Sequence, residues 1–69
     1  MKCAKRDKLR NRAAHILGVL VKLGNEQIEC LKRDDQKRLR EVDKRLDLYY
    51  GKKERALGAL REHTEEHGC

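Results

Sequence analysis

Two halves of this chain are separated by the stretch Cys30-Leu31-Lys32-Arg33-Asp34-Asp35-Gln36-Lys37-Arg38-Leu39. On either side of it, apolar residues recur at alternating steps of three and four, which is the spacing of one face of an α-helix. The rhythm fails between residues 32 and 38, because continuing it would bury an unpaired charged side chain at considerable cost. We therefore expect two amphipathic helices, at about residues 4–33 and 35–67, joined by a turn at Asp34-Asp35.

Each half carries one seam, a row of side chains expected to pack against the other helix. In the first half the seam comprises Leu9, Ala13, Ile16, Leu20, Leu23, Gln27 and Cys30. In the second half it comprises Leu39, Val42, Leu46, Tyr49, Lys53, Ala56, Leu60, His63 and His67. A short connection makes consecutive helices antiparallel neighbours. The pattern predicts an all-α fold, an antiparallel two-helix hairpin that resembles a coiled coil and occupies residues 1–69 as one domain.

Gly24-Asn25 is the rival turn position, since this dipeptide is the stronger local turn signal. The apolar rhythm nevertheless passes from Leu20 to Gln27 without losing register. A glycine inside a helix costs about 1 kcal/mol relative to alanine, which is less than the cost of a buried charge. Asp34 or Asp35 can also cap the second helix, so we prefer the turn there.

Length and composition restrict the class of protein. The chain has 69 residues, of which 43% are charged, and it contains no proline, phenylalanine or tryptophan. This composition is typical of solvent-exposed helices and not of an enzyme with a shaped pocket. The chain has no serine to act as a nucleophile and no glycine-rich phosphate loop. We expect no enzymatic activity, and we expect association to supplement a core that provides only ~3–5 kcal/mol.

The first half carries a second row of apolar residues that its seam does not use. This apolar stripe comprises Ala14, Leu17, Val21, Gly24, Ile28 and Leu31. One partner helix cannot cover both the seam and the stripe, and an exposed row of this length marks an interface. We expect a homodimer of hairpins, which forms a four-helix bundle. The alternative is a single hairpin with one exposed apolar side.

The net charge of +6 is concentrated at the start of the chain. This basic arm comprises Lys2, Lys5, Arg6, Lys8, Arg10 and Arg12, with Asp7 as its one acidic residue. Such an arm is attracted to phosphate, and its cations would surround most of a helix, which suits backbone contact more than base reading. Helix-turn-helix, ribbon and RNA-binding signatures are absent. Binding of nucleic acid is therefore an alternative function, and a solubilising terminus is the simpler one.

Cysteines and histidines gather at the two chain ends. His63 and His67 lie one turn apart, and Gly68 can end the helix and return Cys69 towards them. A turn at Asp34-Asp35 brings Cys3 to the same end of the hairpin. A Cys₂His₂ set for tetrahedral Zn²⁺ then consists of Cys3, His63, His67 and Cys69. The simpler interpretation is two histidines favoured by the helix dipole. We expect no cofactor, with Zn²⁺ as the alternative.

Two other sequence patterns imitate known motifs, a zinc protease site and a secretory signal, but lack features that those motifs require. His63-Thr64-Glu65-Glu66-His67 matches the H-x-x-E-H string of some zinc proteases, but that chemistry needs further ligands and a cleft. The basic arm followed by Ala13–Leu23 imitates a secretory signal, but His15 and Lys22 interrupt the run and no cleavage site follows. The run is also about half the length that a bilayer requires.

The sequence therefore predicts a small helical interaction or regulatory module. It would act through self-association and through an unidentified protein partner. The three cysteines form no disulfide framework, so we expect a cytoplasmic protein without a transmembrane segment. A nucleic-acid-associated protein that uses the basic arm is the first alternative, and a zinc-binding protein is the second.

Overall fold

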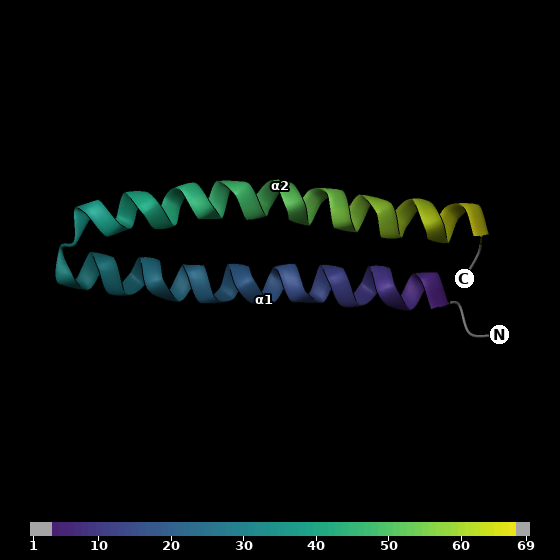
Figure 1. The fold of residues 1–69 in the computed structure, drawn as a ribbon, viewed down its shortest axis with the longest axis horizontal. Helices are drawn as coiled ribbons and strands as arrows, with labels where there is room; N and C mark the ends of the chain where they lie inside the picture. The colour runs from purple at the N-terminus through teal and green to yellow at the C-terminus, as the bar shows by residue number, and fades with distance from the viewer. Residues whose placement is uncertain (1–3, 68–69) are drawn as a thin grey trace.

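The computed structural model of the protein describes residues 4–67, and the side chains of residues 4–66. Two long helices account for nearly all of this range, α1 at Ala4–Arg33 and α2 at Gln36–His67. They lie side by side and antiparallel, so the start of α1 and the end of α2 meet at one end (Figure 1). We call this the open end. The prediction of an all-helical hairpin is confirmed.

The two seams pack against each other in two neighbouring clusters. The cluster nearer the turn consists of Leu23, Cys30, Val42 and Leu46. The cluster nearer the open end consists of Ala13, Ile16 and Ala56. Leu20 and Tyr49 contact both clusters and join them. Val42 is only 2% exposed, the lowest value among these core residues. A narrow strip of side chains therefore supplies the whole described core.

Lys53 occupies a seam position and yet avoids burying its charge. The residue is half-buried, and its Nζ lies 5.4 Å from the centroid of the Tyr50 ring. Long cationic side chains commonly cover apolar surface with their methylenes while the charged group reaches an edge. The contact with the ring face adds a cation–π attraction. Lys53 therefore fits into the seam without an acidic partner.

The turn begins at Asp34, which adopts a left-handed backbone conformation with a φ of 55°. The N–H of Asp35 donates to the carbonyl of Cys30 at 2.9 Å, and the N–H of Asp34 donates to the carbonyl of Leu31 at 3.3 Å. This pair of bonds is a Schellman motif, which satisfies carbonyls at the end of a helix. The chain turns here, and α1 continues without a break through Gly24.

Asp35 has a different role from its neighbour, because it caps the start of α2. Its Oδ1 accepts a hydrogen bond from the N–H of Arg38 at 3.1 Å. Its carbonyl accepts the first helical bond, from the N–H of Leu39 at 3.0 Å. This is the usual geometry of an N-cap residue. One aspartate thus ends α1 while the next begins α2, and the connection needs no further residues.

Asp34→Gly is expected to stabilise the hairpin by roughly 0.5–1 kcal/mol, because glycine adopts a positive φ without the steric penalty of a Cβ. Asp47→Gly is the matched control, since Asp47 lies exposed inside α2. There glycine should destabilise the helix by a few tenths of a kcal/mol. Thermal unfolding followed by circular dichroism measures both effects. A lower melting temperature for Asp34→Gly would contradict this account of the turn.

Candidate functional site

Two packed helices leave two long edges, where the surfaces of α1 and α2 meet. Contacts between the helices mark each of them. On one edge, Gln27 Nε2 donates to Asp43 Oδ1 at 3.0 Å. On the other, Arg38 Nη2 lies 3.9 Å from Glu26 Oε2. Seven residues make nearly two helical turns, so residues seven positions from these contacts lie on the same edges.

The apolar edge is the one marked by Gln27 and Asp43. Leu31 lines a pocket of about 340 Å³ together with Asp43, which places the end of the apolar stripe on this edge. From α2, Tyr50 and Leu57 follow Asp43 at seven-residue steps. The apolar edge as a whole comprises the apolar stripe of α1 (Ala14, Leu17, Val21, Gly24, Ile28 and Leu31) and Tyr50 and Leu57 of α2.

The large side chains of the apolar stripe are exposed in the hairpin. Leu17 is 42% exposed, Ile28 is 50% exposed, and Val21 and Leu31 are each 64% exposed. Ala14 is also exposed, and Gly24 is half-buried. The structure thus places all six predicted interface residues along one face of α1. α2 does not cover the large ones.

The opposite edge carries a concentration of positive charge. Arg12, Lys52 and Arg55 line one pocket of about 350 Å³ there. Lys8 and Lys22 lie one turn before Arg12 and Glu26, and Arg45 lies seven residues after Arg38. We call this surface the basic edge, and it comprises Lys8, Arg12, Lys22, Arg45, Lys52 and Arg55. None of these six cations forms an ion pair within the described residues.

Two of the six cations lie close to uncharged parts of α2. Lys52 Nζ lies 4.7 Å from the centroid of the Tyr49 ring, which belongs to the seam. Arg55 extends back along α2, and its Nη1 would lie 3.6 Å from a Cβ added at Gly51. These contacts orient the two side chains without neutralising them. The basic edge therefore keeps its charge available to an external anion.

The predicted basic arm does not form one surface. Lys8 and Arg12 belong to the basic edge, whereas Arg10 lies seven residues before Leu17, on the side of the apolar edge. Phosphate contact through all the cations of the arm at once would need a partner that surrounds α1. The structure therefore divides the arm between two opposite edges.

Of the remaining arm residues, Lys5 lies seven residues before Arg12 and therefore on the side of the basic edge. Lys5 lines a small pocket at the open end together with Glu62 and Glu66. Arg6 is half-buried, and its Nε has no hydrogen-bond partner in the structure. Lys2 lies outside the described residues. Sequence reasoning also missed Lys22, Arg45, Lys52 and Arg55, although the seven-residue spacing of Arg38, Arg45 and Lys52 was a visible signal.

The predicted metal ligands lie mostly outside the described part of the chain. His63 is 8% exposed on the seam of α2, beside the small pocket at the open end. His67 is the last residue of α2, but its side chain is not described, and Cys3 and Cys69 lie beyond residues 4–67. The described side chains include no cluster of three potential metal ligands. The zinc site remains a prediction.

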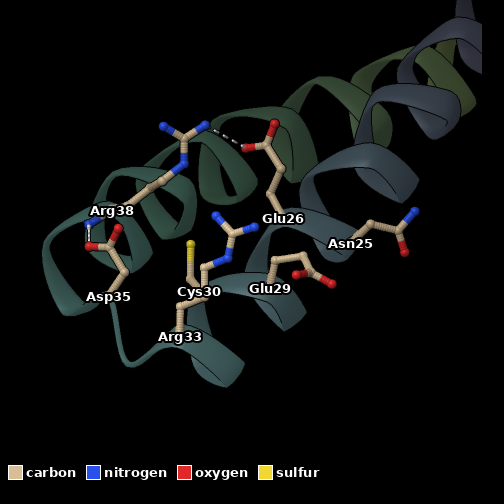
Figure 2. A pocket seen from close by; sticks show the side chains of 7 residues that line it. All are labelled: Asn25, Glu26, Glu29, Cys30, Arg33, Asp35 and Arg38. Atoms are coloured by element: carbon tan, nitrogen blue, oxygen red, sulfur yellow. Dashed lines mark hydrogen bonds and ion pairs between the residues drawn. The ribbon is translucent and has the colours of Figure 1, made fainter.

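Cys30 borders the largest group of polar residues near the turn. A pocket of about 500 Å³ is lined there by Asn25, Glu26, Glu29, Cys30, Arg33, Asp35 and Arg38. In the view of Figure 2, the sulfur of Cys30 appears next to the guanidinium of Arg33, and the Arg38–Glu26 pair appears above both. A nucleophilic cysteine needs an accessible thiolate, whereas Cys30 is 4% exposed and packs with the core. It acts here as a small apolar residue.

Comparison with known protein families, with curated proteins and with solved structures finds no match for this chain. Between residues 4 and 67, neither helix has an apolar stretch long enough to cross a bilayer. The two edges of the hairpin differ in chemistry. One is aliphatic, and the other is cationic.

Proposed function

We propose that this protein is a non-enzymatic interaction module that associates with a second copy of itself through the apolar edge. The observation that carries this proposal is the exposure of the apolar stripe, from 42% at Leu17 to 64% at Val21 and Leu31. Single exposed aliphatic residues are normal on a protein surface, but a contiguous row is a marker of association. Burial of apolar area gains roughly 25 cal/mol per Å², which would supplement the narrow core.

The spacing of the stripe favours a second copy as its partner. Its members follow one another at steps of three, four, three, four and three, so the stripe reads the same in both directions. A two-fold axis near residues 22–23 would pair two α1 helices antiparallel. It would set Leu17 against Ile28, and it would set Ala14 against Leu31 and Val21 against Gly24. Two of these three pairs set a large residue against a small one, which favours close packing.

Charges at the ends of the stripe favour the same arrangement. Arg10 lies one turn before Ala14, and Asp35 lies four residues after Leu31. The antiparallel pairing would bring Arg10 of one copy to the turn of the other, where Asp34 and Asp35 lie, at both ends of the interface. A parallel pairing would bring like charges together instead. Electrostatic complementarity of this kind selects orientation and register. The product would be a four-helix bundle with both basic edges still exposed.

Gly24→Ala and Gly18→Ala form a matched pair that tests this proposal. Both glycines lie inside α1, and a Cβ added at either one would meet no atom within 4 Å. In an isolated hairpin each substitution should therefore stabilise the protein by about 1 kcal/mol. In the proposed dimer only Gly18→Ala should keep this gain, because Gly24 would lie where the two α1 helices cross. Thermal unfolding at several protein concentrations measures both effects.

Sedimentation equilibrium supplies the independent readout. The wild-type protein is expected to be a dimer, with a melting temperature that rises with concentration. A monomer at high micromolar concentration with a concentration-independent melt would refute self-association. Equal stabilisation by both glycine variants would show that Gly24 lies outside the interface. A monomer whose apolar edge binds a different protein would make that protein the occupant and would overturn the proposal.

A further inference from the structure

The acidic residues on the side of the basic edge lie towards the turn, where Glu26 pairs with Arg38 and Glu41 lies four residues before Arg45. α1 carries no acidic residue between Lys8 and Asn25. In α2, Asp43 lies on the apolar edge, where it accepts a hydrogen bond from Gln27. The next two acidic residues, Asp47 and Glu54, follow Asp43 by four and eleven positions, which places them on the same face of the helix. The basic edge is therefore not offset by carboxylates along its central part. An uncompensated cationic surface of this kind raises the local concentration of anions.

We infer that the basic edge binds the phosphate backbone of double-stranded nucleic acid without reading its sequence. The six cations come from both helices, so the site exists only in the folded hairpin. It differs from the basic arm, because half of its residues belong to α2. It also lies opposite the apolar edge, so it does not depend on self-association. An experiment that disproves nucleic-acid binding would therefore leave the proposed dimer intact, and an experiment that disproves the dimer would leave nucleic-acid binding intact.

The dimensions of the basic edge suit a duplex. Lys8 and Lys22 are 14 residues apart in one helix, which corresponds to about 21 Å along the helix axis. Duplex DNA carries one negative charge per ~1.7 Å of its own axis, so a surface of this length faces several phosphates. The hairpin is a rod of 51 × 16 × 11 Å, and its two paired helices fix the backbone positions from which the cations extend. The backbone therefore loses little conformational entropy on binding.

The aromatic residues disfavour single-stranded nucleic acid as the ligand. Proteins that bind single strands stack the bases on exposed aromatic rings. This chain has two tyrosines, Tyr49 and Tyr50, and no phenylalanine or tryptophan, and His15 is a smaller exposed ring between Lys8 and Lys22. Tyr49 packs into both core clusters beneath Lys52, and Tyr50 lies on the apolar edge. The Tyr49 ring lies at the row of cations, but it packs against the core and Lys52 covers its face, so contact is limited to the backbone and carries no base specificity.

The placement of the apolar residues disfavours a membrane. A helix that lies on a bilayer needs apolar side chains that insert while its flanking cations meet the headgroups. Here the aliphatic row and the cationic row lie on opposite edges, so one would point away when the other makes contact. Leu48, which is 54% exposed, and the half-buried Val19 are isolated aliphatic side chains near the cations and form no continuous row. A duplex needs no such insertion.

Three triple variants, each lacking three positive charges, test the inference. The edge variant combines Arg45→Gln, Lys52→Gln and Arg55→Gln. The far-face variant combines Lys37→Gln, Arg40→Gln and Lys44→Gln, whose residues line one separate pocket on α2. The arm variant combines Lys2→Gln, Arg6→Gln and Arg10→Gln. Each is titrated with a mixed-sequence DNA duplex and with one of its single strands, by fluorescence anisotropy between ~50 and ~200 mM salt. Circular dichroism verifies that each variant stays helical.

Wild-type protein should show a slope of log affinity against log salt of about −5 if all six cations engage phosphates. The edge variant should lose about half of that slope and should bind at least about 100-fold more weakly at ~0.1 M salt. The far-face and arm variants should keep slopes close to that of the wild type. The duplex should bind more tightly than the single strand, and a second duplex of unrelated sequence should bind equally well.

Several outcomes would overturn the inference. No binding to the duplex at ~50 mM salt would do so, since electrostatic binding is strongest there. Equal weakening by the edge and far-face variants would show that net charge alone is responsible. Weakening by the arm variant alone would assign binding to the basic arm. Preference for the single strand, or binding to phosphatidylserine vesicles without binding to the duplex, would identify a different ligand class.

Discussion

Val42→Asp is expected to unfold the hairpin, whereas Leu48→Asp is expected to leave it folded. Val42 is 2% exposed and packs with Leu23, Cys30 and Leu46, so a carboxylate there would replace an aliphatic group in the centre of the core. An unpaired charge at such a site costs roughly 3–5 kcal/mol, which equals everything that a core of this size supplies. Loss of helicity at ~25 °C by circular dichroism is the expected result.

Leu48 provides the control because it lies in the same helix and is 54% exposed. Aspartate at that position loses helix propensity of roughly half a kcal/mol and little packing. The two variants carry the same change in charge, so a difference between them reports the depth of burial. Comparable melting temperatures for both would mean that the seam does not hold the helices together.

Leu17→Glu and Ile28→Lys are each expected to dissociate the proposed dimer, and a mixture of the two variants is expected to restore it. In the antiparallel arrangement, Leu17 of one copy faces Ile28 of the other at two symmetric places. In a mixed dimer, one of these places would hold an oppositely charged pair and the other would keep the original aliphatic pair. Each single variant would bury an unmatched charge at both places.

Sedimentation velocity of each variant alone and of their equimolar mixture measures this effect. Leu48→Glu is the control for added charge and should remain dimeric, because Leu48 belongs to neither the seam nor the apolar stripe. Association of the mixture with monomeric single variants would establish both the surface and its register. Dimers in every sample would show that the apolar stripe is not the interface. Monomers in the mixture would reject the antiparallel pairing.

The helices, the turn and the seams could be predicted because each depends on local rules. Leu9, Ile16, Leu23 and Cys30 repeat at seven-residue steps, and a helix must place such residues on one side. Gly24 was correctly kept inside α1, because one glycine costs less than a buried charge. The left-handed conformation of Asp34 was not predicted. Glycine is the usual residue there, and the shortness of the connection places Asp34 in that role instead.

The basic edge could not be found by reading the charges in sequence order. Lys8 and Arg12 lie close in sequence to Lys5, Arg6 and Arg10, so composition groups all five into one basic arm. Their shared position in the sequence conceals that a helix distributes them around its circumference. The cations of α2 join Lys8 and Arg12 only when the two helices are paired in register. Tertiary pairing, and not local composition, therefore defines this surface.

The interval between the two seams has a consequence for chain exchange. Cys30 and Leu39 are nine residues apart, which is about two and a half turns of an α-helix. If the turn straightened and α1 and α2 fused into one rod, the seams of its two halves would face opposite directions. Two such rods could not form a domain-swapped dimer, in which each half packs against the opposite half of the partner. The two seams of one rod would face opposite sides, and a single straight partner cannot lie on both. Straightened molecules would instead form an open-ended assembly, in which each rod contacts two others. Because of the nine-residue interval, only the folded-back hairpin buries both seams in a closed form.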